Sequence, residues 1–267
     1  IMPSLVGSEM CIRDRSIINQ SSINMKILVV GASGATGSQL VAQLLLQQHS
    51  VKVVVRSPHK LPESWKNNKH LQIITANILD LTDTEMRDLV SDCHAVASCL
   101  GHNLTWKGIY GQPRRLVTEA TKRLCNAIES NKLERTTKFV LMNTTGNRNR
   151  DLDERISFAQ KCVIGLLRLL LPPHVDNEMA ADYLRTQIGQ NNTAIEWVAV
   201  RPDGLINEEK TSDYEIFPSP TRSAIFNAGK VSRINVAHFM ASLINDNNLW
   251  STWKGKMPVI YSSSKEN

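Results

Sequence analysis

Three glycines at a spacing of three residues carry the clearest chemistry in this sequence. They follow an apolar, β-branched run at residues 26–30, and a segment with helical spacing of its apolar residues follows them. A strand, a glycine turn and a helix in this order are typical of a site for the pyrophosphate of a dinucleotide, because bare backbone and the N–H groups of a helix N-terminus can approach the phosphates closely. An ordinary glycine-rich turn without a ligand is the alternative. The candidate cofactor-binding residues of this loop are Gly31, Ser33, Gly34, Thr36 and Gly37.

The end of the next strand indicates which cofactor is bound. Residues 51–55 are predicted to form this strand, and Arg56 follows it directly, with no carboxylate before Glu63. In NAD-preferring sites an acidic residue near this point binds the ribose 2′-hydroxyl, whereas an arginine accommodates a 2′-phosphate. Arg56, with Lys60 as a second cation, therefore favours NADP over NAD. Either residue could instead be an ordinary solvated cation.

Two later strands predict further contacts at the same edge of the sheet. Residues 71–75 are expected to form one strand, and Asn77 and Ile78 after it are candidates to bracket the adenine ring. Residues 95–100 are expected to form the next strand, which Gly101 closes. In open α/β sheets the ligand lies in the crevice outside the carboxyl ends of the strands, so Gly101 is expected beside the cofactor.

The candidate substrate pocket comes from the loop after this fourth strand and from a later flank at residues 205–230. The polar and aromatic residues of the loop fit the rim of a pocket for an aromatic substrate. A surface loop whose aromatics cover the neighbouring helix fits them equally well. The candidate pocket residues are His102, Trp106, Tyr110 and Phe226.

The first 24 residues differ from the rest, and Met25 stands directly before the first strand. Residues 5–14 look like the translation of a transposon-derived sequencing adapter. A secretory signal needs a basic start and an apolar core, which this segment lacks, and a transit peptide should lack acids such as Glu9 and Asp14. We therefore expect residues 1–24 to be a disordered, non-native extension and residues 25–267 to form one NAD(P)-binding domain.

Composition narrows the class of protein further. The formal net charge is +6, but no run of cations is interleaved with aromatics, so nucleic acid is not an expected partner. The cysteines lack C-x-x-C spacing, so we expect mostly buried, reduced thiols in a cytoplasmic protein and no metal site. The apolar run at residues 163–171 is too short to cross a bilayer and contains Arg168, so it predicts a packed helix. The cysteines after residue 24 are Cys93, Cys99, Cys125 and Cys162.

The chain resembles an atypical short-chain dehydrogenase/reductase of the NAD(P)H-binding, NmrA-like group, and within that group the flavin reductase/biliverdin reductase B type. The resemblance covers residues 25–261 and implies a Rossmann-like, doubly wound parallel sheet, a single α/β domain with a small variable region that covers the substrate. The segments that carry it are the glycine loop, Arg56, Leu100-Gly101, Thr144-Thr145 and residues 197–202 and 234–240. It implies that the cofactor is also lined by Ala35, Leu100, Thr144, Thr145 and Pro202.

The chain departs from the group's pattern at Asn77, where many relatives have an acid, at Gly204, where the flavin reductase has a histidine, and at the residues for proton transfer. Tyr183 is followed four residues later by Gln187, so the Tyr-x-x-x-Lys pair that transfers a proton in typical members is missing. Thr145 stands where the group places its catalytic Ser or Thr and is the candidate catalytic residue. We expect an NADPH-dependent oxidoreductase that transfers hydride to a planar small-molecule acceptor of the flavin, tetrapyrrole or quinone type. The alternative is a non-catalytic NADP(H)-binding redox sensor or scaffold, with residues 146–175 as a surface for a protein partner.

Overall fold

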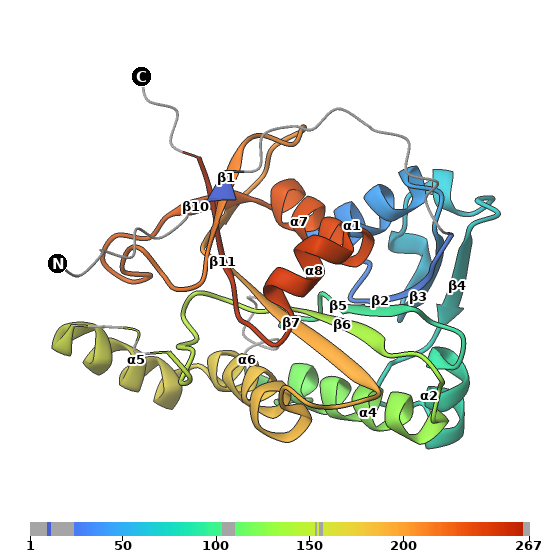
Figure 1. Ribbon diagram of the computed structural model, residues 1–267, viewed down its shortest axis with the longest axis horizontal. Helices are drawn as coiled ribbons and strands as arrows, with labels where there is room; N and C mark the ends of the chain where they lie inside the picture. Colours follow the sequence, from blue (N-terminus) through green and yellow to red (C-terminus); the bar gives the residue numbers. More distant parts are fainter. Residues whose placement is uncertain (1–9, 12–23, 103–109, 153, 155–156, 264–267) are drawn as a thin grey trace, which may run out of the picture.

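The computed structural model describes residues 10–11, 24–102, 110–152, 154 and 157–263. A nine-stranded sheet forms the centre of this part of the chain (Figure 1), and its strand order is β1-β9-β11-β7-β6-β5-β2-β3-β4. Its strands are β1 (Met10–Cys11), β2 (Lys26–Val30), β3 (Ser50–Val55), β4 (Leu71–Thr75), β5 (Ala95–Ser98), β6 (Thr137–Met142), β7 (Ile195–Pro202), β9 (Tyr214–Phe217) and β11 (Val259–Ser262). A separate parallel pair joins β8 (Gly204–Ile206) to β10 (Lys230–Ser232).

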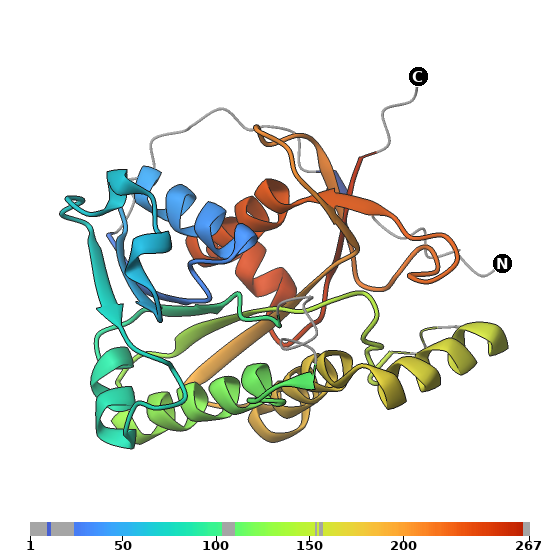
Figure 2. The ribbon, with the colours of Figure 1, turned by 180° about the vertical axis from the view of Figure 1, so that it is seen from behind.

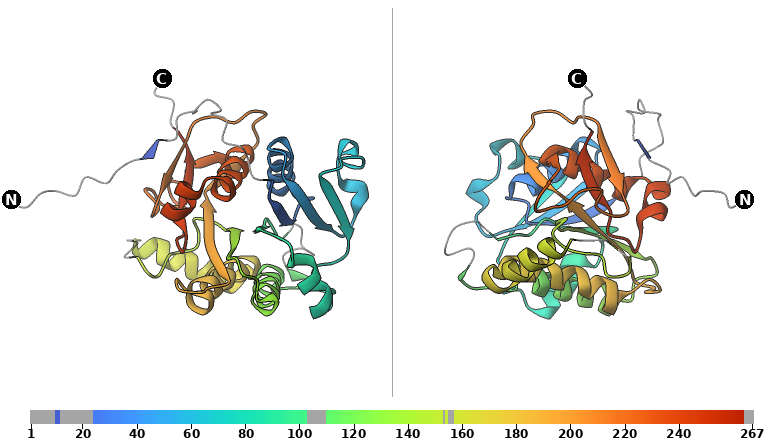
Figure 3. Two further views of the ribbon diagram at one scale, coloured as in Figure 1. Left: turned by 45° about the vertical axis from the view of Figure 1, so that its right-hand side comes forward. Right: turned by 90° about the vertical axis from the view of Figure 1, so that its left-hand side faces the viewer.

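Helices cover both faces of the sheet, as Figures 1 and 3 show from three sides. Helix α5 extends beyond the edge of its layer, most clearly in the view from behind (Figure 2). One layer contains α1 (Ala35–Leu46), α7 (Arg233–Asn245) and α8 (Asn247–Trp253). The opposite layer contains α2 (Asp83–Val90), α4 (Leu116–Asn131), α5 (Phe158–Leu170) and α6 (Pro172–Tyr183).

The two layers explain why the central strands read as continuous apolar runs. In β2, Ile27 and Val29 belong to the core under α1 and α7, whereas Leu28 and Val30 belong to the core against α2 and α4. Successive side chains of a strand point to opposite faces, so a strand covered on both faces must be apolar at every position. All four of these side chains are fully buried.

The topology confirms the predicted doubly wound α/β fold. Strands β4, β3, β2, β5, β6 and β7 are parallel neighbours, and β2 lies between β3 and β5. The chain proceeds from β2 outward in one direction through β3 and β4, then returns to β5 on the other side of β2. The carboxyl ends of β2 and β5 are thus the topological switch point, where ligands bind in such sheets.

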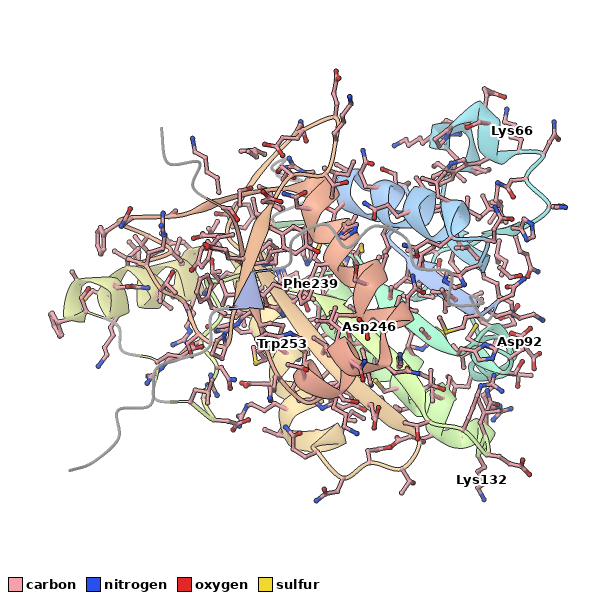
Figure 4. The ribbon with its side chains drawn as sticks, turned by 45° about the horizontal axis from the view of Figure 1, so that its top comes forward. Lys66, Asp92, Lys132, Phe239, Asp246 and Trp253 are labelled. Atoms are coloured by element: carbon pink, nitrogen blue, oxygen red, sulfur yellow. The ribbon has the colours of Figure 1, made fainter. Side chains whose placement is uncertain are left out.

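At the amino ends of the strands, opposite the carboxyl ends, an ion-pair cluster joins β2 and β3 to the turn after α2. Asp92 lies 2.8 Å from Lys26 at the start of β2 and 2.5 Å from Lys52 in β3. Figure 4 labels Asp92 at this end of the molecule. Partial burial raises the pKa of Asp92, but hydrogen bonds from the two lysines outweigh it and lower the pKa to about 2. These ion pairs join the amino-terminal parts of β2 and β3 to the turn after α2.

One expectation about packing is wrong. The apolar run at 163–171 does lie in a helix, α5, but of its side chains only Gln160 and Ile164 are buried. Leu166, Leu169 and Leu170 are 55%, 79% and 50% exposed. The run is apolar on both sides of the helix, yet only one side meets the described protein.

Proline also acts differently from expectation at the end of this helix. The sequence around Pro172 and Pro173 predicts a break between two helices, with the second helix beginning near Asp176. The second helix, α6, instead begins at Pro172. Proline is tolerated at the first helical positions because the N–H it lacks has no partner there.

The N-terminal segment is described only in part. Met10 and Cys11 form β1, which pairs antiparallel with β9, with Met10 opposite Ile216. Asn24 accepts hydrogen bonds from the backbone and hydroxyl of Ser50 at the start of β3. Residues 1–9 and 12–23 lie outside the described residues, so the adapter origin of this segment stays a prediction.

Candidate functional site

The turn after β2 has a backbone geometry that requires glycine at two positions. Gly31 has a φ of +81°, and a Cβ atom there would lie 2.4 Å from the carbonyl oxygen of Cys99. A Cβ atom on Gly37 would lie 2.2 Å from the carbonyl oxygen of Gly31. These contacts are backbone contacts that cannot move aside. The first glycine packs the turn against the end of β5, and the last packs α1 against the turn.

The N-terminus of α1 is open to an anion. Gly34 is its N-cap residue and supplies no side-chain cap, and the first turn holds no acidic residue. Ser33, Gly34 and Ala35 are exposed, and Thr36 is buried. Within the described residues, the N–H groups of Ala35 and Thr36 have no protein acceptor. A turn without side chains and a row of unpaired donors fit the pyrophosphate of a dinucleotide.

The end of β3 lies beside β2 and carries the two predicted cations. Arg56 follows the last residue of β3, and Lys60 ends the short 3₁₀ helix Pro58–Lys60. Both side chains are exposed. The first carboxylate after them, Glu63, forms an ion pair with Lys66 at 2.7 Å. Arg56 and Lys60 are thus available to a phosphate group at this corner of the sheet.

The two adenine candidates after β4 differ in exposure. Ile78 is buried in the core against α2 and α4. Asn77 is partly exposed, and its side-chain oxygen accepts a hydrogen bond from the backbone of Leu79 at 3.5 Å. Asn77 presents an edge toward solvent, whereas Ile78 is part of the sheet packing. Their role at the adenine stays a prediction.

The segment after β5 combines an open glycine with a packed histidine. Leu100 is partly exposed, and its backbone lies against the glycine turn. Gly101 is exposed, and no atom lies within 4 Å of a Cβ built on it, so packing does not demand glycine there. His102 lies 2.8 Å from Asp176 of α6, a buried carboxylate that also accepts the backbone N–H groups of Val117 and Thr118. His102 therefore helps join the start of α4 to α6.

Asp176 remains charged despite its environment. Burial raises the pKa of Asp176, but hydrogen bonds from His102, Thr118 and the start of α4 outweigh it and lower the pKa. This interaction fixes the histidine on the α4–α6 side of the sheet. The contact identifies a structural partner for His102 that the sequence did not reveal.

The aromatic pocket candidates do not gather at one site. The Tyr110 hydroxyl donates to the carbonyl oxygen of Leu170 at the end of α5, and Phe226 is 61% exposed. Trp106 lies outside the described residues. A cavity lies beside the end of β6. The described residues that line it do not include His102, Tyr110 or Phe226.

The end of β6 places two threonines beside the end of β7. Thr145 is buried; its hydroxyl donates to Asp203 at 3.0 Å, and its N–H donates to the carbonyl oxygen of Pro202. The other oxygen of Asp203 accepts the N–H of Gly229 at 2.7 Å. The hydroxyl of Thr144 accepts the N–H of Gly146 at 3.2 Å. A hydroxyl has one proton, so Thr145 bonded to an ionised Asp203 offers a further partner its lone pairs and no donor.

A cavity of about 500 Å³ opens directly beside Thr145. Its walls come from three segments that are distant in sequence: the loop after β6, the start of α5, and the segment between β9 and β10. The lining residues are Thr145, Gly146, Arg148, Glu154, Ser157, Gln160, Ile164 and residues 219–224. Its volume is in the range typical of small-molecule sites.

A buried ion pair supports the wall of this cavity. Arg201 of β7 is fully buried and binds both carboxylate oxygens of Glu154, at 2.7 and 3.1 Å. It also donates to the carbonyl oxygens of Asn147, Pro218 and Met257. This single side chain ties the loop after β6 to the segment after β9 and to the residues before β11. Sequence reasoning missed its role, although a cation at the end of the apolar run 197–200 was a usable signal, because such a charge must be paired.

Tyr183 and two of the thiols are unsuited to proton transfer or nucleophilic chemistry at neutral pH. Burial raises the pKa of Tyr183 to about 12, and its hydroxyl bonds to Asn126 of α4, outside the cavity lining. Burial likewise raises the pKa of Cys93 and of Cys99 to about 12. Among the described residues, no group of three or more His, Cys, Asp or Glu side chains could hold a metal ion.

Comparison with known proteins places this chain in a family. The family model for NAD(P)H-binding proteins matches residues 31–247. The chain therefore belongs to the NAD(P)H-binding family, which confirms the predicted nicotinamide cofactor at the level of NAD(P)H. An uncharacterised chloroplastic protein of Arabidopsis thaliana is 28% identical over 212 residues, which cover 79% of this chain and 69% of that protein.

Solved structures of low identity share the fold. A short-chain dehydrogenase/reductase from Veillonella parvula in complex with NADP matches with a TM-score of 0.66 and 14% identity, over 92% of this chain and 98% of that chain. A protein from Streptococcus pneumoniae described as a candidate NADH-flavin reductase matches with a TM-score of 0.62 and 18% identity, over 90% and 100%. The fold expected from the likeness to short-chain dehydrogenases/reductases is confirmed. In the part of the chain that the structure describes, no helix has the length and apolarity needed to span a membrane.

Proposed function

We propose that this protein is an NADPH-dependent oxidoreductase that reduces a planar acceptor of the flavin, tetrapyrrole or quinone type. The observation that carries the proposal is the cavity of about 500 Å³ that begins at Thr145, at the same carboxyl edge as the open turn after β2. A bound cofactor would supply a hydride, and the protein would hold the acceptor against it in a pocket that limits water.

The cofactor would be bound mainly by backbone and by cations. The turn at Gly31 and Gly37 and the N–H groups at the start of α1 would receive the pyrophosphate. Arg56 and Lys60, exposed at the end of β3, would bind a 2′-phosphate, which is our reason for favouring NADP. The exposed, side-chain-free position at Gly101 would let the cofactor pass close to the backbone after β5.

Thr145 is proposed as a positioning acceptor at the reaction site. Its hydroxyl proton is donated to Asp203, so its lone pairs would accept an N–H of the nicotinamide carboxamide or of the bound acceptor. Tyr183 is not placed to donate a proton, since its hydroxyl bonds to Asn126 and it is not among the described residues that line the cavity. Water that enters the open cavity would therefore supply the proton that accompanies the hydride.

The test is NADPH oxidation by the full chain, followed at the nicotinamide absorbance, with FMN, biliverdin and a quinone in parallel. Turnover with at least one acceptor is expected. Arg56→Ala should weaken NADPH binding about tenfold and NADH binding much less, which corresponds to about 1.4 kcal/mol. Arg87→Gln, on the exposed surface of α2, is the matched control and should change neither affinity. Absence of NADPH binding would refute the proposal.

A second candidate function is supported by the surface of α5. Phe158, Leu166 and Leu169 are 81%, 55% and 79% exposed on this helix, which extends beyond its layer (Figure 2). Exposed apolar patches of this kind often bind a partner. We infer that a non-catalytic redox sensor or scaffold, with residues 146–175 as the protein-binding surface, is the alternative. Tight NADPH binding without turnover across the acceptor panel would favour it.

The location of the protein is a separate inference. The described cysteines form no disulfide, and Cys93 and Cys125 are buried, which fits a reducing compartment. We propose the cytoplasm on this basis, although the similar Arabidopsis protein is described as chloroplastic. Imaging of the tagged protein in its own cells would decide between the two.

A further inference from the structure

We propose that the cavity beside Thr145 selects an acceptor that carries an anionic group, a carboxylate or a phosphate, and that Arg222 is the residue that recognises it. The inference rests on the proposed function, because it treats this cavity as the acceptor site. It narrows the acceptor class to anionic molecules and assigns a specificity residue.

The charge balance of the cavity wall is the first support. Among the described residues that line the cavity, Arg222 is a guanidinium and Glu154 is the one carboxylate. Both oxygens of Glu154 bind the buried Arg201, and one of them also accepts the N–H of Asn149. Glu154 is therefore neutralised from behind the wall, which leaves the Arg222 guanidinium as a cation at the cavity.

Arg222 is held in place without being neutralised. Its guanidinium lies over the ring of Tyr261, 5.6 Å from the ring centre. Within the described residues, no carboxylate oxygen lies within 4.0 Å of its nitrogens. The nearby carboxylate of Asp203 is bonded to Thr145 and Gly229. An aromatic ring orients a guanidinium while leaving its N–H donors for a ligand, so Arg222 suits an incoming oxyanion.

Hydroxyl groups around Arg222 add hydrogen-bond donors. The oxygen of Ser223 accepts the N–H groups of Ile225 and Phe226, and that of Ser157 accepts the N–H of Gln160. Two backbone donors occupy the lone pairs of Ser223 and one occupies a lone pair of Ser157, and neither bond uses the hydroxyl proton, which each serine can donate. Both serines line the cavity. An anion at Arg222 would thus meet a guanidinium and hydroxyl donors together, whereas a neutral quinone would leave them unpaired.

The experiment measures binding to the full chain saturated with NADP⁺, by fluorescence titration with two matched pairs. FMN and riboflavin differ by a phosphate, and biliverdin and its dimethyl ester differ by two carboxylates. We expect the anionic member of at least one pair to bind tenfold or more tightly, and the pair that shows it identifies the group. Arg222→Gln should reduce this preference about tenfold, and Arg87→Gln should leave it unchanged.

Three outcomes would overturn the inference: equal affinities within both pairs, a preference that survives in Arg222→Gln, or no binding of any of the four molecules. Arg222 is exposed, and an unchanged thermal unfolding midpoint will verify that the variant is folded. The titration requires no turnover, so it is independent of the catalytic test. Preference without turnover would keep the anion site and refute the oxidoreductase, whereas turnover without preference would refute only the anion site.

Discussion

The cofactor half and the acceptor half of the carboxyl edge are built by different means. Around β2, β3 and β5 the site is made of backbone. It consists of a turn with φ of +81° at Gly31, a helix start without a side-chain cap at Gly34, and open space beside the backbone of Gly101. Beyond β6 the site is made of side-chain pairs, Arg201 with Glu154 and Thr145 with Asp203. The turn of the first half tolerates no added atoms at Gly31 and Gly37, and the second half tolerates no lost partners.

Sequence separation is the physical root of this difference. The glycines that must approach each other are six residues apart in one turn, whereas Arg201 and Glu154 are separated by 47 positions and Thr145 and Asp203 by 58. Local geometry leaves a readable spacing in the sequence. Long-range pairs leave only isolated charged residues, whose partners depend on the complete fold.

The largest effect is expected from breaking the buried pair of the acceptor half. Arg201→Met would leave Glu154 buried without its cation, which should lower the free energy of unfolding by about 3–5 kcal/mol. Urea unfolding at pH 7 measures this loss. NADPH affinity of the folded protein should stay near the wild-type value, because Arg201 contacts no part of the glycine turn.

The double variant Arg201→Met/Glu154→Leu separates charge from packing. Removing both charges should recover much of the lost stability, since the cost arises from the unpaired carboxylate. A single variant that loses less than about 1 kcal/mol would contradict the role given to this pair.

A methyl group added to the cofactor half should have the next largest effect. Gly37→Ala would press a Cβ atom against the Gly31 carbonyl oxygen, 2.2 Å away, and should cost about 1–3 kcal/mol and most NADPH binding. Thermal unfolding and NADPH fluorescence measure the two losses. Gly165→Ala in α5 is the control: no atom lies within 4 Å of its Cβ, so this variant should be about 0.5–1 kcal/mol more stable.

Gly101→Val tests whether the cofactor passes close to this position. The substitution should affect cofactor binding without disturbing the packing of the protein. Space around the added side chain is open, so the unfolding free energy should change by less than about 0.5 kcal/mol. NADPH should nevertheless bind about tenfold more weakly, because the valine side chain would occupy the open space beside the glycine turn. Isothermal titration measures the affinity. An unchanged NADPH affinity would show that the cofactor does not pass this position.

The smallest effect is expected from pH at the joint between α5 and α6. Burial raises the pKa of Glu178, but His174 at 3.6 Å and the two hydrogen bonds from Arg168 outweigh it and lower the pKa from 4.5 to about 2. A depressed carboxyl pKa stabilises the fold above the unfolded value of 4.5, and this contribution, about 1 kcal/mol, is lost as the pH falls from 4.5 toward 2.

Comparison with Glu178→Gln measures this contribution. The difference in unfolding free energy between the wild type and this variant should shrink as the pH falls through that range. Asp83→Asn is the control, because its carboxyl group is 92% exposed and its ion pair with Arg123 should contribute little. A difference that does not change with pH would show that Glu178 is not the titrating group.

Much of the cofactor half could be predicted from the sequence. The strand before the glycine turn, the helix after it and the cation that follows the next strand all lie as expected, since each is set by neighbours within a few residues. Ile78 and His102 show the limit of this approach. Ile78 packs against α2 and α4, and His102 pairs with Asp176, which lies 74 residues further along the chain.

For the acceptor half, the sequence predicted a segment that borders the site but not the residues that line it. The flank at residues 205–230 was expected to border the substrate pocket, and the cavity lining at residues 219–224 agrees with that location. The expected aromatic walls did not form there, because Tyr110 bonds to Leu170 and Phe226 is largely exposed. Aromatic residues in loops have no local signal that tells a pocket from a surface.

The sequence alone determined the α/β class, the glycine turn and the NAD(P)H-binding family, because backbone geometry at a tight turn demands particular residues at a fixed spacing. Tertiary structure alone decided which residues form the cavity. It paired Arg201 with Glu154, directed the Thr145 proton to Asp203 and held Arg222 over Tyr261. Charge neutralisation and hydrogen-bond direction depend on partners brought together by the whole fold, so they first become visible in three dimensions.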